Sequence, residues 1–193
     1  GLDRVFFTNS GTEAVDGALK LARLYAEHKG TPRARILALE NSFHGRTFGA
    51  LSVTATEKYR RPFEPLVPGV EFVRFNDTAD LEAKFDLPVC ALILETIQGE
   101  GGIHPVSEEF WNLGRRLATL NGALFIADEI QCGLGRTGRF FAFSKYGLKP
   151  DMVVLAKPLA AGLPLAAILA REEVAQAFSP GMHGTTFGGG PLQ

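Results

Sequence analysis

Seven short runs of apolar residues recur along this 193-residue chain, and segments of helical pattern separate them. Several runs are apolar at nearly every position, which is typical of strands that are buried on both faces. Strands that alternate with helices predict a mainly parallel sheet with helices on both faces, an α/β/α sandwich. We expect strands at residues 5–7, 34–39, 70–75, 89–95, 123–127, 151–156 and 165–170.

The segments between these runs carry helix signals. We expect helices at residues 12–28, 78–85, 107–121 and 172–178. Ser107 is a favourable N-cap ahead of Glu108 and Glu109, and Asn121 with Gly122 is a favourable stop. The proline-rich stretch 62–68 is the most loop-like interior segment. Because such sheets bind ligands at the carboxyl ends of their strands, the residues after each strand are the functional candidates.

The composition narrows the class of protein. The chain is 46% hydrophobic and 21% charged, as expected of one globular domain with a substantial core. Its formal net charge of -1, without a cluster of Lys and Arg, argues against a nucleic-acid or membrane-surface partner. No apolar run approaches the roughly 18 to 20 residues of a membrane span.

Two further observations concern the cell compartment and the extent of the chain. Cys90 and Cys132 have no CxxC spacing, so we expect buried free thiols and a reducing compartment, the cytoplasm or an organelle whose targeting sequence is missing. The chain begins without Met and stops after a glycine-rich loop, so we expect an internal piece of a longer protein.

The first two strands are followed by groups that suit a ring and its anionic substituents. Ser10-Gly11-Thr12 offers backbone N–H groups and two hydroxyls where a helix begins, which favours a phosphate, although an ordinary helix cap has the same pattern. Phe43 and His44 supply flat faces, and Arg46 suits a carboxylate or phosphate, although local packing is the alternative.

The fourth and fifth strands end in carboxylates. Glu95 and Glu100 flank a flexible glycine turn, for which a solvated loop is the alternative. Asp128 and Glu129 come directly at the end of the fifth strand, where they face a bound ligand or cap the next turn.

The loop Gly133–Gly138 matches G-x-G-x-x-G, and Asp151 follows it, as in a dinucleotide site. In such sites the first Gly follows the strand at once and the motif opens a helix, and neither holds here. A nicotinamide-dependent oxidoreductase is therefore a remote alternative. No G-x-S-x-G elbow is present, and no metal site is predicted because the spacing of His28, His44, His104 and His183 does not suit ligands.

Lys157 is the only charged side chain between Asp151 and Ala167, in the stretch DMVVLAKPLAAGLPLAA. A surface lysine at a strand end is one interpretation. A catalytic amine is the other, because apolar surroundings favour the neutral, nucleophilic form. Pro158 is expected to bias Lys157 toward an extended backbone.

Six segments, NSGTEA, SFHGRT, ETIQGEGG, DEIQCGLGRTG, LAKPLAAGLPLAA and HGTTFGGGPL, occur in the order and approximate spacing of motifs in class III pyridoxal-phosphate aminotransferases. The whole chain resembles that family, and most strongly its acetylornithine branch. The resemblance implies a type I pyridoxal-phosphate fold. Residues 1–193 would be part of the large, cofactor-binding domain, and the N-terminal segment and the C-terminal small domain would be absent.

The resemblance also implies roles around the cofactor, pyridoxal 5′-phosphate. Lys157 would form a Schiff base with it and carry the proton between the substrate and the cofactor. Asp128 would keep the pyridine nitrogen protonated, and Gln131 would bond the phenolic oxygen. Phe43, with His44 beside it, would cover one ring face and Ile130 the other.

The phosphate and the substrates complete the implied site. Ser10, Gly11 and Thr12 would hold the phosphate together with Thr186 of the neighbouring subunit, beside Thr185, so that a homodimer shares the site. Arg46 would bind the substrate α-carboxylate. Glu100 would help the site alternate between a basic amino donor and 2-oxoglutarate.

The implied reaction moves an amino group from N-acetylornithine, or a similar ω-amino donor, to 2-oxoglutarate. Ornithine, 4-aminobutyrate and succinyldiaminopimelate aminotransferases and glutamate-semialdehyde aminomutase are alternatives in the same family. A cofactor-binding remnant or interaction module is a non-catalytic alternative.

The chain departs from the family pattern at two positions. Thr96 stands where the family often has Pro, and Gly190 where it usually has Asn. A family arginine for substrate carboxylates lies outside the chain, so we expect little or no turnover from this piece alone.

Overall fold

The predicted strands form one seven-stranded sheet. The computed structural model describes residues 1–31 and 35–192, so Ala34, the first residue of the predicted strand 34–39, lies outside the described residues. The strand order across the sheet is β1-β9-β8-β7-β4-β2-β3. The strands are β1 (Arg4–Thr8), β2 (Arg35–Leu39), β3 (Val70–Val73), β4 (Val89–Glu95), β7 (Leu124–Asp128), β8 (Met152–Leu155) and β9 (Ala166–Ala170).

The sheet is mainly parallel, as predicted. β2 pairs in parallel with β3 and β4, β4 with β7, and β7 with β8. β9 runs antiparallel to both β8 and β1. Residues 156–165 connect β8 to β9 through turns without a helix. Because a parallel pair needs a longer crossover connection, this short connection allows only an antiparallel pair.

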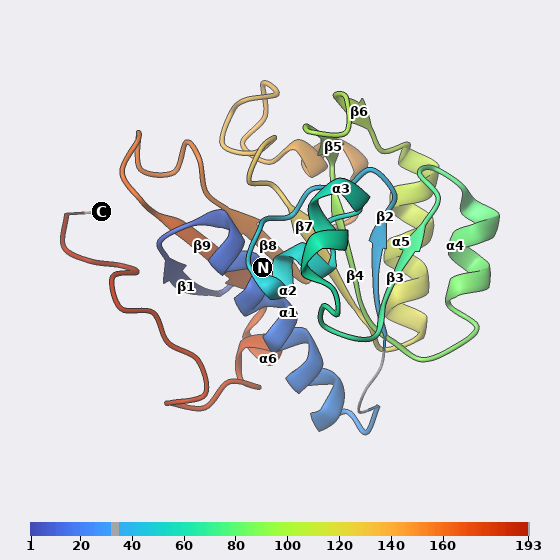
Figure 1. Ribbon diagram of the computed structural model, residues 1–193, viewed down its shortest axis with the longest axis horizontal. Coiled ribbons are helices and arrows are strands. Elements are labelled where there is room, and N and C mark those ends of the chain that lie inside the picture. Colours follow the sequence, from blue (N-terminus) through green and yellow to red (C-terminus); the bar gives the residue numbers. More distant parts are fainter. Residues whose placement is uncertain (32–34, 193) are drawn as a thin grey trace.

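Helices cover both faces of the sheet (Figure 1). Along β4, Ile93 faces a core formed with α1 (Gly11–His28), whereas Leu92 and Leu94 face a core formed with α4 (Thr78–Lys84) and α5 (Glu108–Leu120). This alternation places each strand between two apolar layers and explains why the runs are apolar throughout.

The predicted helix ends are accurate where capping residues mark them. Ser107 is the N-cap of α5, and its Oγ accepts a hydrogen bond from the backbone N–H of Phe110 (3.1 Å). Asn121 is the C-cap, and Gly122 follows with a φ of 66°. The prediction for 172–178 was too long, since α6 spans only Glu172–Ala175.

Several short elements were not predicted, because each is too short for a periodic pattern. They are α2 (Phe48–Ser52), α3 (Glu57–Arg60), the 3₁₀ turns Arg61–Phe63 and Ala142–Tyr146, and the hairpin of β5 (Ile97–Gln98) with β6 (His104–Pro105). The stretch 62–68 is irregular beyond the first of these 3₁₀ turns.

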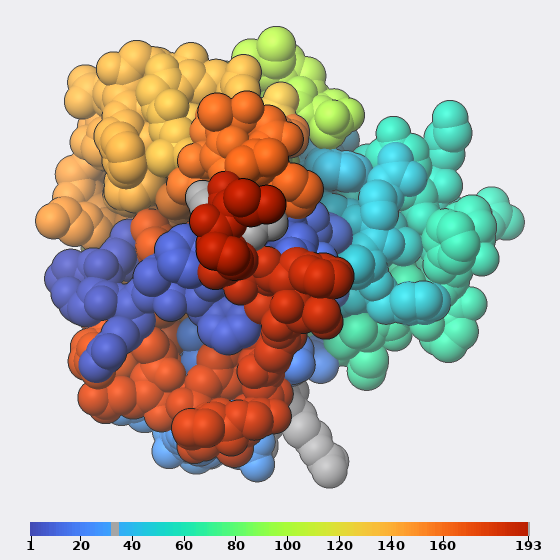
Figure 2. All heavy atoms as spheres, turned by 90° about the vertical axis from the view of Figure 1, so that its left-hand side faces the viewer, coloured from blue at the N-terminus to red at the C-terminus, as the bar shows by residue number. Residues whose placement is uncertain are grey.

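The residues after α6 lie across the N-terminal part of the chain. Figure 2 shows this last segment, coloured red, over the N-terminal residues, coloured blue. Asn9 Nδ2 donates to Thr185 Oγ1 (3.0 Å), and a Cβ on Gly188 would come within 2.5 Å of the Phe7 carbonyl oxygen. Glycine therefore permits this close approach of the two backbones.

Both cysteines are buried free thiols, as predicted. Burial raises the pKa of Cys90 to about 11, and it also raises the pKa of Cys132. Both side chains therefore stay protonated near neutral pH and act as core residues. Within the described residues, no helix combines the length and the apolar character needed to cross a bilayer.

Asp151, which precedes β8, ties three elements together. Its Oδ2 accepts from the backbone N–H of Phe125 (2.8 Å), and its Oδ1 lies 3.0 Å from Arg115 Nη2 and 2.8 Å from Arg171 Nη2. Burial raises the pKa of Asp151, whereas the Phe125 N–H and the two guanidinium groups favour its ionised form. The carboxylate thus fixes α5 and the end of β9 to the sheet.

We predict that Asp151→Ala lowers the free energy of unfolding by about 3 kcal/mol, because it removes the buried partner of two guanidinium groups. Urea unfolding of the purified variant measures this loss. Glu172→Ala, which removes the exposed partner of Arg4, is the control and should cost much less. Equal losses from the two substitutions would contradict the assigned role of Asp151.

Candidate active site

A cavity of about 370 Å³ lies where β4, β7 and β8 end, beside the start of α1. It brings together eleven of the thirteen predicted site residues from five separate segments of sequence. They are Ser10, Gly11, Thr12, Phe43, His44, Arg46, Glu100, Asp128, Ile130, Gln131 and Lys157.

The other two predicted residues, Thr185 and Thr186, do not line this cavity in their own chain. They line a larger cavity of about 660 Å³ beside α1, together with Lys20 and His183. The smaller cavity is the better candidate for chemistry, because buried charged groups converge on it, as described next.

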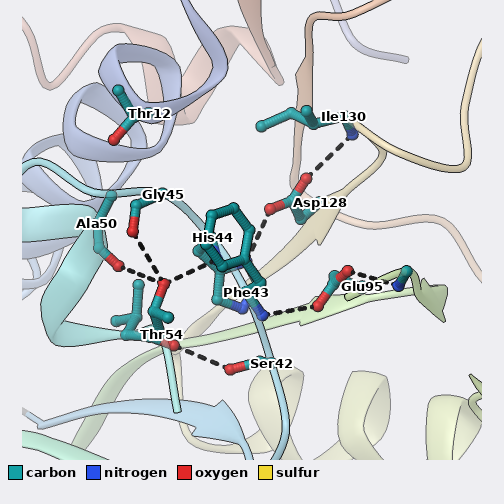
Figure 3. Close-up of polar contacts among 12 residues, drawn as sticks. Thr12, Ser42, Phe43, His44, Gly45, Ala50, Thr54, Glu95, Asp128 and Ile130 are labelled. Atoms are coloured by element: carbon teal, nitrogen blue, oxygen red, sulfur yellow. Dashed lines mark hydrogen bonds and ion pairs between the residues drawn. The ribbon is translucent and has the colours of Figure 1, made fainter. Parts of the chain in front are cut away.

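Asp128 forms a buried pair with His44. Its Oδ2 lies 2.7 Å from His44 Nδ1, and its Oδ1 accepts from the backbone N–H of Ile130 (3.0 Å) (Figure 3). The exposed fractions of Asp128 and His44 are 3% and 2%. Because a carboxylate oxygen only accepts, the hydrogen of this contact lies on Nδ1 of His44, and the carboxylate keeps lone pairs for another donor.

The backbone of His44 is held in turn by Thr54. The Thr54 hydroxyl accepts from the His44 N–H (2.9 Å) and lies 3.1 Å from the carbonyl oxygens of Gly45 and Ala50 (Figure 3). The ring is therefore fixed from both ends, by Asp128 at Nδ1 and by Thr54 at the main chain.

Glu95 is a second buried carboxylate, next to Asp128 in the register of β4 and β7. Its Oε1 accepts from the Phe43 N–H (2.9 Å) and its Oε2 from the Gly99 N–H (3.1 Å). Burial raises the pKa of Glu95 to about 7, while His44 opposes and Asp128 adds to this shift. From the sequence we expect Glu95 beside a flexible turn, and its contact with Phe43 is not predicted. Its position at the end of a fully apolar strand was the available signal.

The start of α1 forms one wall of the cavity. Ser10 is the N-cap, and within the described chain its side chain makes no capping hydrogen bond to the helix. A Cβ on Gly11 would lie 2.8 Å from Ile130 Cδ1, so glycine lets the Ile130 side chain reach this wall. The first N–H groups of a helix lack intrahelical partners, which favours an anion here.

The hydroxyl of Thr12 contacts the turn that carries Arg46 and Thr47. Thr12 Oγ1 accepts from the N–H groups of Arg46 and Thr47 (3.1 Å each) and lies 2.8 Å from Thr47 Oγ1. It shapes the turn at Gly45, whose φ is 136° and where a Cβ would come within 2.3 Å of Thr12 Oγ1. The Thr12 backbone lies at the helix start, and the role of its hydroxyl toward a phosphate stays a prediction.

Lys157 lines the cavity just beyond β8, but its conformation differs from the prediction. Its φ is 27°, in the left-handed region, so Pro158 does not hold it in an extended backbone. Lys157 is exposed, and so are Gly162 and Leu163 in the turn that follows. Its apolar neighbours in the sequence therefore do not bury it.

A comparison with known families decides the class of this site. The family described as Aminotransferase class-III matches residues 1–193, the whole chain. The chain belongs to the class III aminotransferase family. Enzymes of this family use pyridoxal phosphate.

Aminotransferases of known name are similar to the chain over nearly all of its length. It is 50% identical over 189 residues to the acetylornithine aminotransferase of Aquifex aeolicus, a match covering 98% of the chain and 50% of that protein. It is 47% identical over 193 residues to the acetylornithine aminotransferase of Methanocaldococcus jannaschii, with 100% and 48% covered. The chain thus spans about half the length of these curated relatives.

Solved aminotransferases share the fold. The ornithine aminotransferase of Toxoplasma gondii ME49 superposes with a TM-score of 0.94 at 39% identity, covering 98% of the chain and 46% of that structure. An amine transaminase from an uncultivated Pseudomonas species, solved in its PLP-bound form, has a TM-score of 0.88 at 31% identity, with 98% and 50% covered. The predicted α/β fold of this aminotransferase class is confirmed.

The G-x-G-x-x-G loop is not a dinucleotide site. Residues 131–138 form consecutive turns and open no helix, and a Cβ on Gly133 would come within 2.7 Å of the Glu129 carbonyl oxygen. Asp151 is committed to Phe125, Arg115 and Arg171. These observations, with the family match, rule out the oxidoreductase interpretation.

We predict that Glu95→Gln makes the free energy of unfolding less dependent on pH between about 4.5 and 7. The folded protein keeps the Glu95 proton where the unfolded chain has lost it, so the wild-type free energy of unfolding falls as the pH rises through this window. Urea titrations between pH 4.5 and 8 measure the two slopes.

The comparison isolates Glu95, since Glu129 and Asp151, whose pKa values burial also raises, are present in both proteins. Identical slopes in the wild type and the variant would show that Glu95 is ionised across the window.

Proposed function

We propose that this chain is part of the large domain of a pyridoxal-phosphate-dependent aminotransferase, which moves an amino group from N-acetylornithine, or a similar ω-amino donor, to 2-oxoglutarate. The buried Asp128–His44 pair, in one cavity with Lys157, is the observation that carries the proposal. Relatives named acetylornithine aminotransferase, which are 50% and 51% identical to the chain, support N-acetylornithine as the donor.

The residues present fit the cofactor. Gln131 Oε1 is buried in the cavity wall with no hydrogen-bond partner among the described residues, so this acceptor is available to a phenolic O–H. Gly11 leaves the space that Ile130 fills, and the start of α1 suits the phosphate through Ser10 and the backbone N–H groups of Gly11 and Thr12. Phe43 and Ile130 line the cavity and suit the two ring faces.

When bound, pyridoxal phosphate supplies an electron sink that stabilises negative charge at the reacting substrate carbon. Asp128 acts as the counter-charge at the ring nitrogen, and His44 and the Ile130 N–H keep its carboxylate oriented. The carboxylate also favours a proton on that nitrogen, since an adjacent opposite charge stabilises the protonated form.

Lys157 has two roles in the proposal. Its amine would hold the cofactor, and it would also take the proton from the reacting substrate carbon as a base and give it up again as an acid. Lys157 is exposed and lines the cavity just after β8, which suits a group that must release one partner and reach another.

The substrates and the second subunit complete the proposal. Arg46 binds the α-carboxylate of the donor, and Glu100, exposed on the hairpin loop, helps the site accept both a basic donor and 2-oxoglutarate. Thr186, beside Thr185, does not line this cavity in its own chain, which suits a homodimer in which it reaches the partner's phosphate. The protonated thiols suit the cytoplasm.

Ornithine is the second candidate donor, because the Toxoplasma gondii structure that resembles the chain is an ornithine aminotransferase. The two donors differ by an acetyl group on the α-nitrogen. The described part of the cavity contains no residue whose contacts would distinguish one donor from the other.

We predict that the complete protein containing this chain shows its highest kcat/KM with N-acetylornithine when 2-oxoglutarate is the acceptor. A panel of N-acetylornithine, ornithine, 4-aminobutyrate and succinyldiaminopimelate measures this preference, with glutamate formation as the readout. A higher value for ornithine would transfer the assignment to the second candidate. No activity with any δ- or ε-amino donor would overturn both.

A further inference from the structure

Arg46 projects into the cavity without an acidic partner. It is exposed, it lines the cavity, and within the described residues it forms no ion pair. A long side chain in this state samples many rotamers, and a substrate carboxylate must immobilise it on binding. A contact that fixes Arg46 beforehand would therefore strengthen binding.

Tyr59, on the short helix α3, supplies such a contact. The Arg46 Cζ lies 3.6 Å from the centroid of the Tyr59 ring, which is the distance of direct stacking, and 5.6 Å from the centroid of the Phe43 ring. Stacking uses the face of the guanidinium and leaves its in-plane N–H donors free for a carboxylate.

Tyr59 also contacts Phe43. The two rings meet edge to face, with centroids 6.2 Å apart and an interplanar angle of 83°. The backbone of Arg46 is fixed separately, since its N–H donates to Thr12 Oγ1. The turn and the Tyr59 ring together therefore determine where the guanidinium lies.

We propose that Tyr59 is a positioning residue that holds Arg46 ready for the substrate carboxylate, an inference that rests on the proposed role of Arg46. The aromatic face performs this role, and the hydroxyl does not. Tyr59 does not line the cavity, so its effect on the substrate passes through Arg46.

The test compares Tyr59→Leu with Tyr59→Phe in the complete holoenzyme. Tyr59→Leu should raise KM for N-acetylornithine by about 2- to 5-fold, the range of an exposed cation–π contact, with kcat within about twofold of the wild type. Tyr59→Phe should behave as the wild type, because it keeps the ring.

A matched donor that lacks the carboxylate shows whether the effect of Tyr59→Leu depends on that group. N-acetyl-1,4-diaminobutane is the same donor without its carboxylate, and its KM should not change in Tyr59→Leu. The affinity for glutarate, measured by calorimetry without turnover, should fall by the same factor as for N-acetylornithine. Equal changes for the two donors, an unchanged KM in Tyr59→Leu, or a loss in Tyr59→Phe as large as in Tyr59→Leu would overturn the inference.

Arg46→Ala separates this inference from the proposed function. If Arg46→Ala weakens the binding of N-acetylornithine and glutarate while Tyr59→Leu does not, the proposed role of Tyr59 is wrong and that of Arg46 stands. If Arg46→Ala has no effect on either ligand, both roles are wrong. Transamination of N-acetylornithine by the wild type, measured beside these variants, tests the reaction itself.

Discussion

A carboxylate buried at the end of a buried strand needs compensation, and Asp128 is such a group. At 3% exposure it has lost nearly all contact with water, and it is stable there because His44 and the Ile130 N–H donate to its two oxygens. These contacts require the chain after β2 to pass over the end of β7, and Thr54 and Glu95 hold it there. The geometry of the cavity therefore follows from one buried charge.

The parallel sheet explains why separate segments of sequence share one cavity. β4 and β7 end in register, so that Glu95 lies beside Asp128, and Lys157 follows the neighbouring β8. Side chains at one edge of a parallel sheet point into the same crevice, which is where ligands bind in such folds. The two neighbouring carboxylates have different roles. Asp128 is oriented by His44 and the Ile130 N–H and faces the cavity, while Glu95 holds the loops that carry Phe43 and Gly99.

The sequence predicted the strands and most of the cavity, since apolar runs mark strands and residues that line the cavity lie at or just after the ends of five of the seven runs. It could not predict the direction of β9, because an apolar run has the same pattern in both directions. Tyr59 was missed because α3 spans only Glu57–Arg60 and has no period to detect. The contact of the Thr12 hydroxyl with the turn at Gly45 was not predicted, and the backbone of Lys157 was predicted wrongly, because both depend on contacts and turns that residue spacing does not specify.

The central claim is that Lys157, at the end of β8, faces the cofactor whose ring nitrogen Asp128 contacts. Borohydride treatment of the complete protein with pyridoxal phosphate, followed by peptide mapping by mass spectrometry, tests this most directly. We expect one peptide that carries the reduced cofactor, with the modification at Lys157 and its loss in Lys157→Ala. Labelling at another lysine, or none in a protein that binds the cofactor, would contradict it.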